Sequence, residues 1–94
     1  MPDTLFNRSS IPVISPGYRF QWEEAQGCYV LLYPEGMVTL NSAAGEILKR
    51  VAEREQTVEE IVLSLKAAFN GADLEADVYE FLEEAHGNGW IKSK

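Results

Sequence analysis

Hydrophobic and polar residues alternate along the first third of the chain with the period of β-strands. From residue 18 to 23, aromatic residues point one way and polar residues the other, as expected for a half-buried strand. Residues 28–33 are apolar on both faces, so we expect a strand that is covered on both sides. Residues 37–40, with a β-branched pair, predict a third strand. Because short turns join the three segments, they predict an antiparallel meander with residues 28–33 in the centre.

A turn and a helix cap enclose the third of these strands. Pro34 presets φ for a turn and Gly36 tolerates positive φ, so Pro-Glu-Gly is expected to close a hairpin. Beyond the strand, Asn41 or Ser42 can accept a backbone N–H from the first turn of a helix. The third strand is therefore expected to lead directly from a tight hairpin into a helix.

After the third strand the apolar residues recur at helical spacing and predict three helices. Their apolar positions are Ala44, Ile47, Leu48 and Val51 in the first, Val58, Ile61, Val62, Leu65, Ala68 and Phe69 in the second, and Leu74, Val78, Phe81, Leu82 and Ala85 in the third. Thr57 and Glu60 form a capping-box pattern before the second helix, and Asn70-Gly71 is expected to end it. Asp73 is the expected cap of the third helix.

The predicted order of three strands and three helices is that of an α+β, winged helix-turn-helix-like domain with its sheet placed first. We assign residues 18–94 to this domain, with Trp90 and Ile91 folding back onto its core. Residues 1–17 hold three of the four prolines and show no clear period, which predicts an N-terminal arm. The arm is flexible, covers the chain's own sheet, or reaches a second copy, and the sequence does not choose among these.

The net negative charge of the chain argues against two classes of binding partner. The chain of 94 residues has a net charge of −7, which argues against nucleic acid and against an anionic membrane surface. Residues 73–91, which would contain the recognition helix of a DNA-binding protein, hold six acidic residues and no Lys or Arg. Such a helix repels phosphates. The charge leaves a basic peptide or a basic protein open as the partner.

The chain lacks the residue combinations that most catalytic and metal sites need. Cys28 and His86 are the only cysteine and the only histidine, and no glycine-rich phosphate loop is present. We therefore expect no catalytic residues, no metal site and no cofactor, and hence no enzyme. The longest apolar run, residues 28–33, is far too short to span a membrane. The start of the chain lacks a signal-peptide pattern, so the expected compartment is the cytoplasm.

One edge of the predicted sheet and the third helix together favour a binding surface. If residues 37–40 end the sheet, their outer edge carries unpaired N–H and C=O groups that can pair with a strand of another chain. The third helix offers a wide apolar stripe flanked by Asp77, Glu80 and Glu84. The alternative interpretation is that these apolar residues are simply core, which is the more common case for each of them taken singly.

Several of these residues together resemble the PqqD family, the small proteins of pyrroloquinoline quinone (PQQ) biosynthesis. The matching residues are Arg19, Leu31-Leu32-Tyr33-Pro34-Glu35-Gly36, Leu40-Asn41, Ala44, Ile47-Leu48, Thr57-Val58-Glu59-Glu60-Ile61, Asp77-Val78, Phe81-Leu82 and Gly89-Trp90. The resemblance covers about residues 18–92. The sequence departs from it at Arg54-Glu55-Gln56, where the family usually has an Asp-Gly turn, and at Ala85, where a larger aliphatic residue is common.

This resemblance implies a peptide chaperone with the fold of a RiPP recognition element. Such a domain binds the leader of a short ribosomal precursor peptide as an added antiparallel strand, with peptide side chains in a cleft beside the third helix. It then presents the peptide to a radical S-adenosylmethionine (SAM) enzyme, which cross-links a Glu and a Tyr and holds the iron–sulfur cluster itself. The peptide-binding residues implied here are Met37, Val38, Thr39 and Leu40 in the pairing edge and Leu74, Asp77, Val78, Phe81 and Leu82 along the cleft.

Two other interpretations stay open from the sequence. A non-catalytic adaptor or dimerisation module, derived from a winged helix and binding a folded protein partner, would have a similar composition. The face of the second strand that carries Tyr29, Leu31 and Tyr33, taken as its outer face, also indicates self-association as a homodimer.

Overall fold

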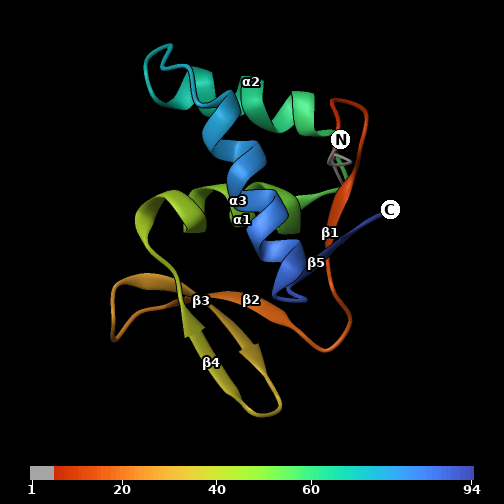
Figure 1. The fold of residues 1–94 in the computed structure, drawn as a ribbon. Helices are drawn as coiled ribbons and strands as arrows, with labels where there is room; N and C mark the ends of the chain where they lie inside the picture. Colours follow the sequence, from red (N-terminus) through yellow and green to blue (C-terminus); the bar gives the residue numbers. More distant parts are fainter. Residues whose placement is uncertain (1–5) are drawn as a thin grey trace.

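The computed structural model describes residues 6–94 and arranges them as two small sheets and three helices (Figure 1). The elements are β1 (Pro12–Ile14), β2 (Arg19–Glu23), β3 (Cys28–Tyr33), β4 (Gly36–Thr39), α1 (Ser42–Glu53), α2 (Val58–Ala68), α3 (Glu75–Gly87) and β5 (Ile91–Ser93). Strands β2, β3 and β4 form an antiparallel meander with β3 in the centre. The predicted α+β class, with the sheet before the helices, is confirmed. No helix within the described residues is long and apolar enough to cross a membrane.

The helices cover one face of the meander, and they lie above it in Figure 1. In the strand register Phe20 is opposite Leu31 and Leu31 is opposite Val38, so these three side chains share that face. Leu31 is fully buried in the main core, and Phe20 and Val38 pack against the same core. Most of the remaining core residues come from the apolar stripes of the three helices.

The structure corrects the prediction of which face of β3 points outward. Leu31 lies in the core and Tyr29 packs against it, so the face with Tyr29, Leu31 and Tyr33 is the inner one. Residues on the opposite face alternate with these and include Val30 and Leu32. A strand that is apolar on both faces gives no sequence signal for which one meets the helices. The interface for self-association that the sequence placed on Tyr29, Leu31 and Tyr33 is therefore wrong, while a homodimer as such stays untested.

The turn between β3 and β4 is shorter than expected. Tyr33 pairs with Gly36, so only Pro34 and Glu35 form the loop and Gly36 is the first residue of β4. Gly36 does not adopt the positive φ that was expected of it. As a member of the ladder, it takes a strand conformation instead.

The helix starts follow local capping chemistry. The Asn41 side chain accepts the N–H of Ala44 at 2.8 Å, and Thr57 makes the predicted capping box with Glu60. Helix α3 begins one residue later than predicted, because Leu74 occupies the N-cap position without a side-chain bond. Asp73, the predicted cap, still accepts the N–H of Glu75, at 3.3 Å.

The described part of the N-terminal arm packs on the end of the chain. Strand β1 pairs antiparallel with β5, and the N–H of Lys94 donates to the C=O of Ile11. Phe6 is buried in the main core. The sequence did not predict this second sheet, because a three-residue strand has no readable period and its partner lies almost eighty residues away. Residues 1–5 of the arm lie outside the described residues.

Gly45 of helix α1 packs tightly against Tyr29 of the sheet, and this contact yields a prediction. A Cβ at this position would lie 3.0 Å from Cδ2 of Tyr29, whose ring stacks on Phe20 and contacts the edge of Trp22. We expect Gly45→Ala to lower the free energy of unfolding by about 1 kcal/mol, because the cost of overpacking exceeds the gain in helix propensity. Urea unfolding measures this.

The matched control is Gly87→Ala in α3, where an added Cβ has nothing within 4 Å. This variant is expected to be slightly more stable than the parent chain, because alanine favours the helix. A gain in stability from both substitutions would contradict the tight packing of Gly45 on Tyr29.

Candidate functional site

Strand β4 is an edge strand of the meander and pairs with one strand only, which is β3. The N–H of Leu40 donates to the C=O of Tyr29 at 3.0 Å. In an antiparallel ladder, residue pairs that exchange hydrogen bonds alternate with pairs that do not. Val38, two residues before Leu40 and opposite Leu31, therefore also turns its N–H and C=O toward β3. Met37 and Thr39 then turn their N–H and C=O groups to the open edge. Within residues 6–94, no backbone bond from these two residues leads to another part of the chain outside the sheet.

A cavity of about 260 Å³ lies between the end of β4, the start of α1 and one side of α3. We call it the strand cavity. Its lining residues are Thr39, Leu40, Asn41, Ala43, Ala44, Ile47, Asp77, Phe81, Glu84 and Trp90. The structure thus brings together four residues of the predicted site from two separate parts of the chain: Thr39 and Leu40 at the end of β4, and Asp77 and Phe81 of α3. An added strand on β4 would have this cavity beside it.

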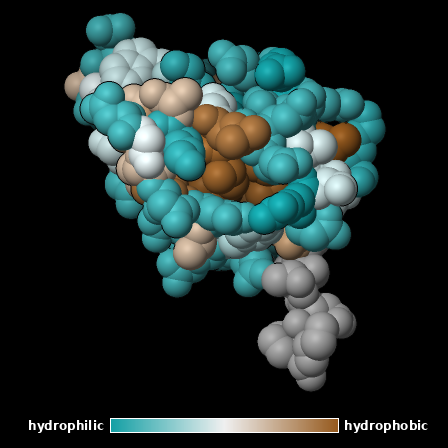
Figure 2. Space-filling view, turned by 90° about the horizontal axis from the view of Figure 1, so that it is seen from above, coloured by the Kyte–Doolittle hydropathy of each residue, from teal (hydrophilic) through white to brown (hydrophobic). Residues whose placement is uncertain are grey.

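A larger cavity of about 710 Å³, which we call the helix cavity, adjoins the strand cavity among the three helices. Its lining residues are Ser42, Ala43, Glu46, Ile47, Leu65, Phe69, Ala72, Leu74, Asp77 and Val78. Most of them are apolar. Figure 2 shows the face seen from above Figure 1, where hydrophobic side chains gather in a hollow that hydrophilic side chains surround. Three predicted site residues, Leu74, Asp77 and Val78, line this second cavity.

The predicted site residues divide between surface and core. Met37 is 41% exposed and Thr39 is also exposed, while Phe81 is half-buried at the strand cavity. Leu82 is fully buried in the core and lines neither cavity. The other apolar residues of the predicted site pack in or against the same core: Val38, Leu40, Leu74 and Val78. Leu40 lines the strand cavity, Leu74 and Val78 line the helix cavity, and Val38 lines neither. The side chain of Leu82 therefore anchors α3 in the core and does not form a wall of either cavity.

Helix α1 supplies site residues that the sequence did not single out. Ala43 and Ile47 line both cavities, and Asn41, the cap of α1, lines the strand cavity. From the sequence, Ile47 belongs to an apolar stripe that is indistinguishable from core. Only the three-dimensional arrangement of α1 and α3 shows that part of this stripe borders a cavity.

Acidic groups dominate the electrostatics of both cavities, whose linings contain no Lys or Arg. Arg50 holds Glu46 at 2.9 Å and neutralises it. Asp77, which is exposed and lines both cavities, and Glu84 make no ion pair within residues 6–94. The site therefore attracts cationic groups, most strongly near Asp77.

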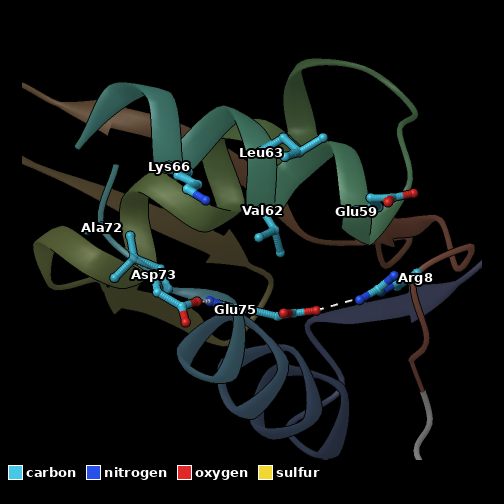
Figure 3. Close-up of a pocket in the computed structure, with 9 residues that line it drawn as sticks. Arg8, Glu59, Val62, Leu63, Lys66, Ala72, Asp73 and Glu75 are labelled. Carbon is cyan, nitrogen blue, oxygen red and sulfur yellow. Dashed lines mark hydrogen bonds and ion pairs between the residues drawn. The ribbon is translucent and has the colours of Figure 1, made fainter. Parts of the chain in front are cut away.

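A third hollow, between α2, the start of α3 and the N-terminal arm, has a different character (Figure 3). Arg8 and Glu75 form an ion pair across it at 3.8 Å, and their side chains are 68% and 45% exposed. Such an exposed pair contributes about 0–1 kcal/mol to stability. Burial raises the pKa of the nearby Tyr79 hydroxyl, Glu75 and Glu59 raise it too, and Arg8 opposes them. Of the predicted site residues only Leu74 lines this hollow, whose lining mixes charged and apolar side chains.

Comparison with known proteins gives one family. The family model of coenzyme PQQ synthesis protein D (PqqD) matches residues 28–91. The "PqqA binding protein" of Azotobacter vinelandii is 47% identical over 93 residues, covering 98% of each chain. That of Pseudomonas paraeruginosa is 51% identical over 90 residues, covering 95% of this chain and 97% of the relative.

A solved structure extends the likeness to the whole fold. It is the solution NMR structure of the PqqD truncation of Methylobacterium extorquens PqqCD, described as a functional and stand-alone RiPP recognition element. The two structures superpose with a TM-score of 0.77 at 25% sequence identity, over 95% of this chain and 96% of the other. Sequence and fold therefore agree, and the chain belongs to the PqqD family.

Proposed function

We propose that this chain is a peptide carrier of pyrroloquinoline quinone biosynthesis. It binds the ribosomally made precursor peptide, PqqA, as an added strand on the open edge of β4. It presents the bound peptide to a radical SAM enzyme that cross-links a Glu and a Tyr. The observation that supports this proposal is the lining of the strand cavity, where Asp77 and Phe81 of α3 lie together with Thr39 at the end of the edge strand β4.

The names of the relatives and the description of the solved structure both indicate a binding role. The geometry of β4 fits strand addition, in which main-chain bonds give affinity and side-chain pockets give selectivity. Four backbone groups face outward, namely the N–H and C=O of Met37 and of Thr39. At about 1 kcal/mol each they contribute about 4 kcal/mol, which the ordering of a flexible peptide largely offsets. Weak to moderate affinity suits a carrier that must release its peptide.

An NMR titration tests the proposal. Isotope-labelled protein is titrated with a synthetic PqqA peptide of Azotobacter vinelandii, and a scrambled peptide of the same composition serves as control. We expect amide shifts to cluster in residues 36–41 and 74–85. If the peptide leaves these amides unmoved, the placement of the site is wrong and the adaptor alternative gains ground.

The charge of the site yields a second prediction. We expect Asp77→Asn to weaken binding of the PqqA peptide about three-fold at low salt. Asp77 is the acid that both cavities share, and it makes no ion pair with any residue from 6 to 94. The difference should vanish near 1 M salt, where the Debye length falls to about 3 Å. Calorimetric titrations at the two salt concentrations measure it.

Glu83→Gln is the matched control for this charge effect. Glu83 is an exposed acid of the same helix and lines neither cavity, so its removal leaves the affinity at each salt concentration close to that of the parent chain. Equal losses in the two variants would show that only the overall negative charge attracts the peptide.

A further inference from the structure

We propose that the helix cavity is a second compartment of the peptide site. It takes an aromatic or long aliphatic side chain from the part of the precursor peptide that precedes the paired strand. The inference rests on the proposed function and extends it, because it assigns a direction to the bound peptide and a chemical class to one of its anchors.

The direction of the peptide follows from the direction of β4. This strand runs from Gly36 to Thr39 and leads into α1 at Ser42. A peptide that adds antiparallel runs the opposite way, so its amino-terminal end leaves the sheet beside Thr39. The strand cavity lies at that end of β4, since Thr39, Leu40 and Asn41 line it. Residues that precede the paired segment therefore emerge at the start of α1.

The two cavities adjoin at this point. Ala43, Ile47 and Asp77 line both of them. A peptide that leaves β4 beside Thr39 passes over these three residues into the helix cavity. The free volume of about 710 Å³ is ample for a large side chain.

The lining of the helix cavity selects the chemistry of its occupant. Leu65, Leu74 and Val78 form apolar walls, and Phe69 at the end of α2 is 44% exposed. Covering this ring with an apolar side chain removes both surfaces from water. Asp77, at the junction of the cavities, favours a cationic residue next to the apolar anchor. The expected occupant is an apolar residue adjacent to a Lys or Arg.

The test combines two peptides with two protein variants. One peptide is the full-length Azotobacter vinelandii PqqA, and the other lacks the residues that precede the segment paired with β4. The first variant, Phe69→Ala, removes a wall of the helix cavity. The second, Leu63→Ala, is a matched truncation on α2, because Leu63 is 59% exposed and lines the hollow of Figure 3 instead. Circular dichroism checks that both variants fold.

We expect Phe69→Ala to bind the full-length peptide about five-fold more weakly and the shortened peptide as the parent chain does. Leu63→Ala should bind each peptide unchanged. The inference is overturned if the parent chain binds the two peptides equally, or if Phe69→Ala has the same effect on both. Strand addition itself would survive that result as long as the shortened peptide still shifts the amides of residues 36–41. If the full-length peptide leaves those amides unmoved, the proposed function fails as well.

Discussion

A Thr39→Pro variant is expected to keep its fold and to bind the PqqA peptide about 30-fold more weakly than the parent chain. Proline has no backbone N–H, and its ring stands where an added strand would pair. Because Thr39 turns its backbone away from β3, the substitution removes no bond of the β3–β4 ladder, and edge strands tolerate proline at such positions. The lost pairing corresponds to about 2 kcal/mol. Calorimetric titration measures the affinity, and thermal melting followed by circular dichroism reports the fold.

Thr39→Val separates the backbone from the side chain. It keeps the N–H and the β-branched shape and only replaces the hydroxyl with a methyl group, so its affinity should match that of the parent chain. A Thr39→Pro variant that still binds the peptide normally would show that the open edge of β4 is not where the peptide pairs.

Truncation of two neighbouring residues of α3 is expected to affect two different properties, namely stability at Leu82 and peptide affinity at Phe81. Leu82 is fully buried in the core, so Leu82→Ala should lower the free energy of unfolding by about 3 kcal/mol through the cavity that it leaves. Phe81 is half-buried and lines the strand cavity, so Phe81→Ala should weaken peptide binding about ten-fold with a smaller loss of stability. Urea unfolding and calorimetric titration measure the two effects.

Leu82→Met is the control for the core position, because a substitution that nearly conserves volume should cost less than about 1.5 kcal/mol. If Leu82→Ala retained full stability but lost the peptide, Leu82 would be a cleft residue, as the family resemblance had implied. If Phe81→Ala bound the peptide as tightly as the parent chain, the strand cavity would not hold peptide side chains.

Features of the fold that depend on local chemistry were predictable from the sequence. The meander, the helices and the caps at Asn41 and Thr57 follow from periodicity and from short-range hydrogen bonding. The errors arose where tertiary packing decides. Gly36 pairs with Tyr33 and is therefore part of β4 rather than of the turn. The inner face of β3 is the one whose Leu31 lies in the core with the helices.

The candidate site was only partly predictable for the same reason. The order of the strands leaves β4 at an edge, and the sequence indicated as much for residues 37–40. The sequence could not separate Phe81 from Leu82, since both lie on one apolar stripe and only three-dimensional packing buries Leu82. Nor could it show that Ala43 and Ile47 of α1 border the cavities.

Hydrogen exchange of individual β4 amides, measured by NMR with and without the PqqA peptide, tests strand addition most directly. In the free protein the outward amides of Met37 and Thr39 should exchange rapidly, whereas those of Val38 and Leu40, which face β3, should be protected. Bound peptide should protect Met37 and Thr39 and leave the other two little changed. If the peptide binds while Met37 and Thr39 still exchange rapidly, strand addition on β4 is contradicted.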